Sequence, residues 1–304
     1  IQDSSYLQKH IASILTLPYV DQERIEKAGL TVALDAINSS GAIAVPQLLD
    51  ALGVECVVIN DDPSGDFAHN PEPLPAHLEG LSNAVKDSNC ALGISVDPDV
   101  DRLAFVCEDG SMFGEEYTLV AVADYILSVK NGATVSNLSS SRALRDVTQN
   151  AGGEYHASAV GEVNVVQKMK EVNAVIGGEG NGGIIVPDLH YGRDALVGIA
   201  IFLTHFVKKE MTMTALKASY PQYTIIKNKI QLTPDLNVDE LLEGIKERFS
   251  NEELNTVDGV KIDFTDGWVH LRKSNTEPII RVYAEAATNE TANELASKVM
   301  KEVD

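Results

Sequence analysis

The sequence predicts an α/β protein in which two consecutive doubly wound α/β domains are followed by a C-terminal α+β domain. Three observations lead to this fold class. Short apolar, β-branched runs alternate with helical patterns in the first third of the chain, and the same alternation restarts after Gly110. In the last part, strand-like runs are instead grouped between two helical patterns. We therefore predict domains at residues 1–111, 112–222 and 223–304.

In the first domain the apolar runs LTVALDAI, VECVVIN and LGISV predict strands, and the segments between them predict helices. The strands are expected at 30–37, 54–60 and 92–96, with helices at 42–52 and 77–86. Because a helix separates each strand from the next, the sheet should be parallel. The segment His69-Asn70-Pro71 is interpreted as a turn before the second of these helices.

The second and third domains differ in the order of their predicted elements. In the second, helices at 115–129, 141–149, 163–171 and 193–209 enclose strands at 133–137, 155–159 and 174–177. In the third, strands are expected at 223–232, 259–264, 267–271 and 279–284, with helices at 238–249 and 290–303. Grouped strands favour an antiparallel sheet, whereas strands that alternate with helices favour a parallel one. Because the first and second domains share this alternation, we predict that they are structural relatives of each other.

Charge and cysteine content exclude several classes of function. The 304 residues include 24 Lys and Arg against 45 Asp and Glu, which gives a net charge of −21. Such a field repels nucleic acids and anionic membranes, although a local arginine pocket can still hold a small anion. The three cysteines form no CxxC pair, and the N-terminus has no signal-peptide pattern. We expect a cytoplasmic protein without nucleic-acid or membrane partners, and its oligomeric state is open.

The segment Asp97-Pro98-Asp99-Val100-Asp101-Arg102 is the sharpest local motif. Three carboxylates at alternate positions after a buried strand can converge on one hard cation, and Mg²⁺ prefers oxygen ligands. A solvated acidic turn is the plainer alternative. An EF-hand is disfavoured because Arg102 stands where the sharp turn requires Gly. A phosphatase of the haloacid-dehalogenase type, with Asp97 as nucleophile, is a further alternative, but no later segment supplies its lysine and second acidic pair.

Two other segments are candidates for ligand binding. Gly177-Gly178-Glu179-Gly180-Asn181-Gly182-Gly183 is a glycine-rich loop that allows close backbone approach, and Glu179 and Asn181 suit sugar hydroxyls. Arg272-Lys273-Ser274-Asn275-Thr276-Glu277-Pro278, followed by Arg281, concentrates cations and hydroxyls in an acidic chain. Such a turn suits a phosphate group, although a basic surface turn has the same composition.

Taken together, DPDVDR, GGEGNGG and RKSNTEPIIR occur in the order and spacing of the α-D-phosphohexomutase family, and the chain resembles that family over essentially its whole length. These enzymes include phosphoglucomutases, phosphomannomutases and phosphoglucosamine mutases. The resemblance implies a Mg²⁺-dependent intramolecular phosphotransferase, an isomerase of carbohydrate metabolism. Such an enzyme interconverts hexose 1-phosphate and hexose 6-phosphate through a phosphoserine and a bound hexose 1,6-bisphosphate. The preferred hexose stays open among glucose, mannose and glucosamine.

The resemblance also implies roles for individual residues. The three aspartates, Asp97, Asp99 and Asp101, match the metal ligands, and Arg102 matches the arginine that ends the metal loop. Glu179 and Asn181 match the sugar-specificity loop. The residues that match the phosphate-binding loop are Arg272, Ser274, Asn275, Thr276 and Arg281. Arg142 and Arg193 are further candidates for cations of the substrate pocket.

One element of the family pattern has no counterpart. The family's nucleophile lies in a Ser-His-Asn-Pro loop of its first domain, whereas Ala68 precedes His69-Asn70-Pro71 here. We therefore expect that the chain corresponds to the second, third and fourth domains, lacks the phosphoserine domain and is inactive by itself. The general acid and base are not identified. A non-catalytic module that binds sugar phosphates is the alternative function for the isolated chain.

Overall fold

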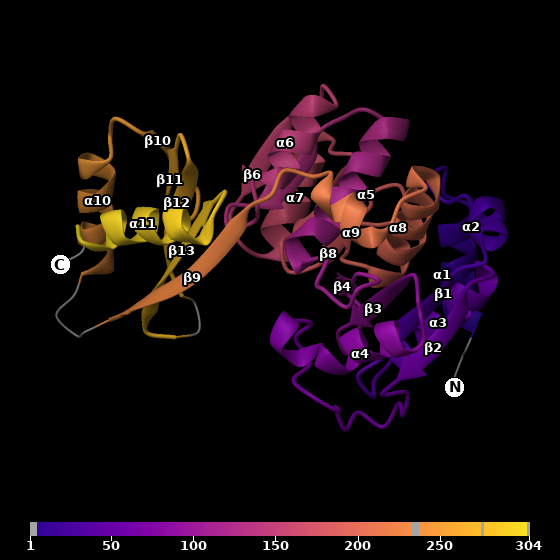
Figure 1. Ribbon diagram of the computed structural model, residues 1–304. Coiled ribbons are helices and arrows are strands. Elements are labelled where there is room, and N and C mark those ends of the chain that lie inside the picture. The colour runs from indigo at the N-terminus through magenta and orange to yellow at the C-terminus, as the bar shows by residue number, and fades with distance from the viewer. Residues whose placement is uncertain (1–4, 233–236, 275–276, 303–304) are drawn as a thin grey trace.

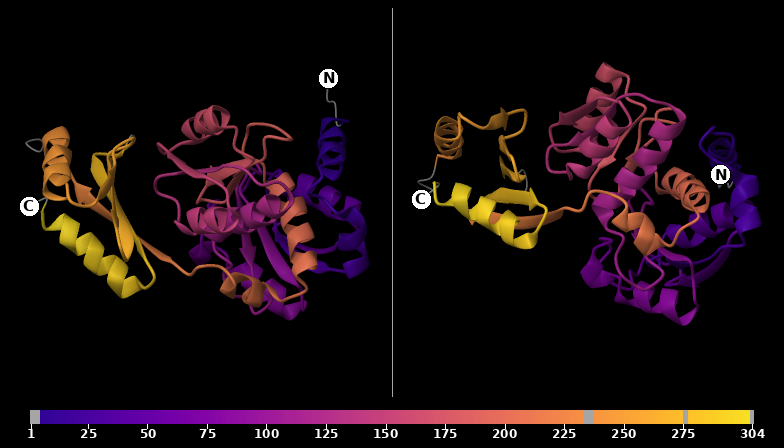
Figure 2. Two further views of the ribbon diagram at one scale, coloured as in Figure 1. Left: turned by 90° about the horizontal axis from the view of Figure 1, so that it is seen from above. Right: turned by 45° about the horizontal axis from the view of Figure 1, so that its top comes forward.

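The computed structural model describes residues 5–232, 237–274 and 277–302. Its helices and strands build three sheets, and we refer to each sheet with its helices as the first, second and third unit (Figure 1). Two units lie together at one end of the molecule, and the third, with the C-terminal helix, lies at the other (Figure 2). No helix within the described residues combines the length and the apolar composition needed to span a membrane.

The first unit is a four-stranded sheet in the order β2-β1-β3-β4. Its strands β1, β2 and β3 are parallel, and β4 runs antiparallel beside β3. The elements of this unit are α1 (Ser5–Leu15), α2 (Gln22–Ala28), β1 (Thr31–Asp35), α3 (Gly41–Ala51), β2 (Glu55–Ile59), the 3₁₀ turn η1 (Pro75–His77), α4 (Glu79–Asp87), β3 (Leu92–Val96) and β4 (Leu103–Val106).

The second unit repeats this arrangement. Its sheet has the order β6-β5-β7-β8, again with the last strand antiparallel. The elements are α5 (Glu115–Val129), β5 (Thr134–Asn137), α6 (Ala143–Asn150), β6 (Tyr155–Ser158), α7 (Glu162–Val172), β7 (Ile176–Glu179), β8 (Gly183–Ile185), α8 (Ala195–Lys209) and α9 (Met213–Ala218). The same strand order in both units agrees with the expectation that they are structural relatives.

The third unit is an antiparallel sheet in the order β10-β11-β12-β13-β9. The first strand of the unit along the chain therefore pairs with the last. Helices α10 and α11 pack on one face of this sheet. The elements are β9 (Thr224–Gln231), α10 (Val238–Arg248), β10 (Glu253–Asn255), β11 (Val260–Phe264), β12 (Gly267–Lys273), β13 (Ile279–Ala286) and α11 (Asn289–Met300).

The predicted fold class is confirmed, with two helix-flanked α/β sheets followed by an α+β unit. The exact positions of the domain boundaries stay a prediction. The expected parallel sheets each carry one antiparallel edge strand, β4 and β8, and the sequence did not predict this antiparallel pairing. β8 is three residues long, which is too short to show a period of two.

Helix α8 explains why the first two units lie together. Every residue from Ala195 to Phe206 is buried, so the helix is apolar on all sides. It packs against α1, α2 and α3 of the first unit and against α5 of its own unit. One continuous apolar core consequently includes Val32 and Phe105 of the first unit together with Phe202 of the second.

Candidate functional site

The predicted metal loop begins where β3 ends. Asp97, Asp99 and Asp101 bring one carboxylate oxygen each to within 4.8 Å of the others. The loop is fixed by Asp97, whose Oδ1 accepts the backbone N–H groups of Asp101 at 3.0 Å and Arg102 at 2.9 Å. Val100 lies between Asp99 and Asp101 with φ +59°. This backbone conformation costs a β-branched residue free energy and is concentrated at functional sites.

The donors of this loop fit a hard divalent cation. Oδ1 of Asp101 is buried and has no hydrogen-bond partner, so one oxygen is left for a ligand. Burial raises the pKa of Asp97 to about 7, and the neighbouring Asp101 adds to the effect. A bound cation would offset both the burial and the repulsion, and three carboxylates are the ligand type that Mg²⁺ prefers.

Arg102 lies beside these carboxylates without a close hydrogen bond to them. Its Nε is 3.6 Å from Oδ2 of Asp97 and 3.9 Å from Oδ1 of Asp101. That nitrogen is buried and has no hydrogen-bond partner. The guanidinium therefore lies next to the predicted metal position with donor capacity left over, which suits an anion held beside the cation.

The metal loop and the glycine-rich loop are joined through their backbones. The N–H of Leu103 donates to the carbonyl of Gly182 at 3.0 Å, and Arg102 forms an antiparallel bridge with Gly183. Gly182 has φ +88°, and a Cβ there would come within 2.3 Å of the Leu103 carbonyl oxygen. Only glycine allows this approach. Two loops that are far apart in the sequence thereby become one structure.

Arg193 connects the same two loops through its side chain. Its guanidinium donates to Asp101 of the metal loop and, at 3.0 Å, to Oε2 of Glu179 of the glycine-rich loop. Oε2 of Glu162, at the start of α7, is 3.5 Å from Nε of Arg193. The sequence suggested Arg193 only as a cation of the pocket, whereas its side chain is an ion-paired connector between two predicted ligand-binding loops.

Glu179 is held from both sides by the protein. Besides Arg193 on Oε2, its Oε1 accepts Nδ2 of Asn137 at 2.9 Å and the N–H of Gly161 at 3.2 Å. Asn181 accepts the N–H of Gly183 at 3.2 Å with its Oδ1. Both residues line one cavity, so the structure places the two predicted sugar-binding side chains in the same wall.

This cavity, of about 150 Å³, lies between the second and third units. Arg272, the first residue of the predicted phosphate-binding loop, lines it from the third unit. The other lining residues are Glu115, Glu116, Asn137, Ser139, Ser140, Val160, Glu179, Gly180, Asn181, Lys227 and Tyr283. The cavity therefore brings residues of the predicted sugar-specificity loop and the first residue of the predicted phosphate-binding loop together.

Behind Arg272, basic side chains form a row across three strands. Arg272 of β12 is opposite Arg281 of β13, which is opposite Lys229 of β9. Side chains at directly opposed positions share one face of a sheet. Arg281 is ion-paired with Glu277 at 2.9 Å, and Ser274 is buried just beyond β12. Asn275 and Thr276 lie outside the described residues.

Arg142, predicted as a pocket cation, lies elsewhere. It is buried between the second and third units, where it donates to Asp263 at 3.1 Å and to the carbonyl of Gly267 at 2.8 Å. It lines a different cavity from Glu179 and Arg272. Nε2 of His69 contacts Asp35 at the end of β1 at 2.9 Å, and Glu72, three residues further on, is 3.9 Å from Arg102.

Several polar residues of the cavity were missed by sequence reasoning. Asn137 is the last residue of the buried strand β5, and Ser139 and Ser140 follow it. Polar residues at the carboxyl end of a parallel strand are a signal that could have located them. Glu116 is a second omission. Burial raises the pKa of Glu116 to about 8, which favours the protonated carboxyl group, a hydrogen-bond donor, beside this cavity.

Comparison with known proteins decides the family. Residues 6–110 match the model of the phosphoglucomutase/phosphomannomutase α/β/α domain II, residues 114–223 match that of domain III, and residues 229–302 match that of the C-terminal domain. The chain belongs to the phosphoglucomutase/phosphomannomutase family. The resemblance inferred from the three motifs is thereby confirmed.

Individual relatives agree with this assignment. The chain is 36% identical to a phosphoglucomutase/phosphomannomutase of Thermococcus kodakarensis over 93% of its own length and 63% of the relative's. A family member from Burkholderia thailandensis has a structure with a TM-score of 0.81 and 26% identity, covering 93% of this chain and 63% of that one. An Aspergillus fumigatus N-acetylphosphoglucosamine mutase, solved with GlcNAc-6P and magnesium, shares the fold with a TM-score of 0.66 and 14% identity, covering 98% and 69%.

The chain is shorter than the proteins it matches. It spans a little under two thirds of the length of the curated relatives from Methanopyrus kandleri and Thermococcus kodakarensis, at 65% and 63%.

Proposed function

We propose that this chain supplies the metal-binding, sugar-binding and phosphate-binding parts of a Mg²⁺-dependent phosphohexomutase. The proposed reaction interconverts hexose 1-phosphate and hexose 6-phosphate through a phosphoserine and a bound hexose 1,6-bisphosphate. The proposal rests on one observation, which is that side-chain contacts and a shared cavity bring the three motifs together. Arg193 links Asp101 to Glu179, and Glu179 shares one cavity with Arg272.

Each loop has a distinct part in this proposal. Asp97, Asp99 and Asp101 would hold Mg²⁺, which supplies neutralisation of the charge on the phosphoryl group in transfer. Arg102 beside them would bind the same phosphoryl group. Arg272, Ser274, Asn275, Thr276 and Arg281 would hold the phosphate that is not transferred. The binding of magnesium and GlcNAc-6P by the Aspergillus fumigatus relative supports this division.

Glu179 and Asn181 would orient the sugar between the two phosphate positions. Because Glu179 also holds Arg193, its substitution should disturb sugar binding and the connection to Asp101 together. Glu116, protonated at neutral pH, can donate a hydrogen bond to a sugar oxygen in the same cavity. The relatives' names do not agree on one sugar, so glucose, mannose and glucosamine phosphates are all candidates.

The proposal assigns the phosphoryl-carrying serine to a Ser-His-Asn-Pro loop, and no such loop occurs in the 304 residues. We therefore propose that these residues alone bind sugar phosphate but do not catalyse the interconversion. The proposed setting is the cytoplasm.

The test combines binding and turnover. Titration calorimetry in Mg²⁺ would measure glucose 1-phosphate, mannose 1-phosphate and glucosamine 1-phosphate on the chain and on Arg272→Ala. We expect at least one hexose phosphate to bind and Arg272→Ala to weaken it about tenfold or more, since a charged hydrogen bond is worth roughly 1.5–3 kcal/mol. Lys168→Ala, at a partly exposed residue of α7 that pairs with Glu171, is the control.

Two outcomes would contradict the proposal. One is a chain that binds no hexose phosphate, or binds it equally well after Arg272→Ala. The other is turnover of hexose 1-phosphate by the 304 residues with added hexose 1,6-bisphosphate, which would place the phosphoryl carrier inside this sequence. Binding of hexose phosphate without turnover supports the division of labour proposed here, whereas a trapped aspartyl-phosphate at Asp97 would favour the phosphatase alternative.

A further inference from the structure

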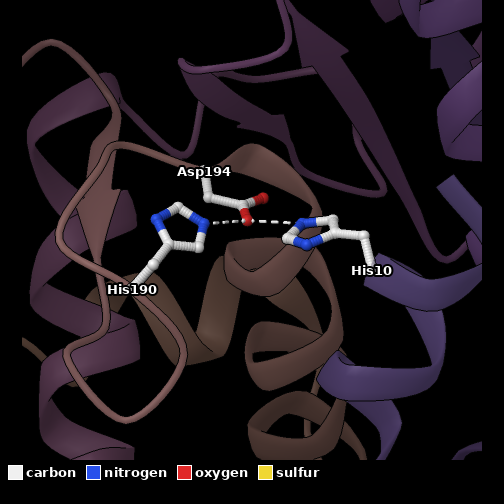
Figure 3. A group of neighbouring side chains, drawn as sticks. All are labelled: His10, His190 and Asp194. Atoms are coloured by element: carbon white, nitrogen blue, oxygen red, sulfur yellow. Dashed lines mark hydrogen bonds and ion pairs between the residues drawn. The ribbon is translucent and has the colours of Figure 1, made fainter. Parts of the chain in front are cut away.

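Outside the proposed site, two histidines and a carboxylate meet at the boundary between the first two units (Figure 3). His10 comes from α1, His190 from the loop before α8, and Asp194 is the N-cap of α8. Nε2 of His10 is 2.7 Å and Nε2 of His190 is 3.0 Å from the same atom, Oδ2 of Asp194. Figure 3 shows the two rings approaching that oxygen from opposite sides.

The carboxylate is fixed before any ligand arrives. Its other oxygen, Oδ1, accepts the N–H of Val197 at 3.1 Å in the first turn of α8. Asp194 is only 6% exposed, whereas the side chains of His10 and His190 are 31% and 43% exposed. The buried oxygen is therefore held in place, and the two imidazoles provide a route from solvent.

We propose that His10, His190 and Asp194 bind one Zn²⁺ ion, through the two Nε2 atoms and Oδ2, with water completing the shell. Zn²⁺ takes His nitrogen and Asp oxygen at about 2.0–2.2 Å, which puts tetrahedral ligand atoms roughly 3.4 Å apart. The three ligand atoms already lie within 4.8 Å of one another, with the nitrogens 2.7 and 3.0 Å from the oxygen. Lengthening the two nitrogen–oxygen separations by roughly 0.7 and 0.4 Å brings them to this tetrahedral value.

The donor set distinguishes this site from the three-aspartate loop. Imidazole nitrogen suits zinc and its transition-metal neighbours, whereas all-carboxylate groups suit Mg²⁺. Within the described residues, these are the two groups of three side chains arranged to hold a metal. The chain would thus hold two different ions in two chemically different sites.

The position of the site gives the ion a structural consequence. It would join residue 10 of the first unit to residues 190 and 194 of the second. Asp194 directly follows Arg193, whose guanidinium holds Asp101 and Glu179. Zinc at this point would therefore fix the start of α8 and the backbone that carries the connecting arginine, as a positioning element remote from the reacting atoms.

The experiment uses Co²⁺ as a spectroscopic probe and Zn²⁺ as its competitor on the 304-residue chain. Mg²⁺ in large excess keeps the three-aspartate loop occupied. We expect one equivalent of Co²⁺ to give visible ligand-field absorption of a His-containing site, and Zn²⁺ to displace it. Zn²⁺ should also raise the midpoint of thermal unfolding, because it binds the folded arrangement of the three ligands more tightly than the unfolded chain.

His190→Gln is the decisive variant, because glutamine can keep a hydrogen bond to Asp194 while the imidazole ligand is lost. Its Co²⁺ affinity should fall at least tenfold, with thermal unfolding in the presence of a chelator unchanged. His156→Gln is the matched control, since His156 is a partly exposed histidine of β6 that faces Glu154. Equal Co²⁺ binding by the two variants, or absence of a Co²⁺ spectrum in the unmodified chain, would overturn the proposal.

Discussion

The boundary between the first and second units is apolar, whereas the boundary between the second and third units is polar. The first and second units share one apolar core, in which the rings of Phe105 and Phe202 stack with centroids 3.8 Å apart. The second and third units meet through polar and charged groups instead. Arg142 of the second unit donates to Asp263 of the third, and its backbone N–H donates to Glu285, which is fully buried.

This difference indicates how the proposed site can work. An apolar core is non-directional but cannot separate without exposing surface to water, so the metal loop and the glycine-rich loop stay in one body. The third unit has its own separate core of α10, α11 and one sheet face. Its hydrogen bonds to the second unit can break and form again, which suits a wall of the cavity that must admit and release a sugar phosphate.

The largest expected effect comes from breaking the shared core. Phe105→Ala removes a ring that packs on Phe202 and, at 6.4 Å between centroids, on Phe113. We expect a loss of about 4 kcal/mol of unfolding free energy, as for buried aromatic-to-alanine changes. Hydrogen exchange should then speed up in the first and second units together and stay unchanged in the third. Phe264→Ala, in the third unit, should give the reverse pattern.

The next effect concerns the polar boundary. Arg142→Ala removes the ion-pair partner of Glu285 and one of the two arginines beside Asp263, the other being Arg145 at 4.0 Å. Removing one partner of a buried ion pair costs about 3 kcal/mol. Differential scanning calorimetry should show the third unit unfolding at lower temperature. The double variant Arg142→Ala, Glu285→Gln should recover part of the loss, because an amide oxygen still accepts Nε1 of Trp268. A double variant as unstable as the single one would show that packing, and not charge, dominates here.

Acidification should also weaken the third unit. Burial lowers the pKa of His270 to about 4 from its usual 6.5, because the imidazolium cannot be solvated there. The unfolded chain therefore binds a proton below pH 6.5 that the folded chain does not bind until about pH 4. The contribution of neutral His270 to the free energy of unfolding is therefore fully present above that range and is lost as the pH falls. The loss is about 2 kcal/mol at pH 5. Chemical denaturation of the chain and of His270→Gln should show the shallower pH dependence in the variant.

The smallest expected effect comes from an exposed ion pair at the boundary between the first and second units. Arg24 of α2 pairs with Glu210, just after α8, at 2.9 Å, with the two side chains 45% and 75% exposed. Although this pair joins the same two units as Phe105, an exposed ion pair contributes little after solvent screening. Arg24→Ala should change the free energy of unfolding by at most about 0.5 kcal/mol in urea titration. A loss comparable to that of Phe105→Ala would contradict the dominance of the apolar core.

Most of the fold could be predicted because segments with regularly spaced apolar residues indicate helices and strands directly. The strand at 92–96 and the helix at 115–129 begin and end where the sequence placed them. Helices α1 and α2 were not predicted, and their buried residues are covered by elements distant in the sequence, chiefly α8. Short edge strands such as β8 owe their existence to a neighbouring strand, and that partner is not visible in a local pattern.

The residues of the candidate site likewise fall into those that the sequence could predict and those that it could not. Motifs with several chemically matched residues in one segment, such as the three aspartates, could be found because the convergence is local. The role of Arg193 could not be found, because its partners Asp101 and Glu179 are 92 and 14 residues away. The family resemblance suggested Arg142 as a pocket cation, and only the approach of β11 and β13 shows that its partners are carboxylates of the third unit.

The strand order of the third sheet has a consequence for biosynthesis. β9 ends at Gln231, but its pairing partner β13 starts at Ile279, so the first strand of that sheet leaves the ribosome well before the strand it pairs with. Until β13 is made, β9 presents unpaired N–H and C=O groups, the kind of edge that recruits strands from other chains. The alternating Lys227 and Lys229 on this strand give the waiting nascent edge a positive charge that keeps identical copies apart.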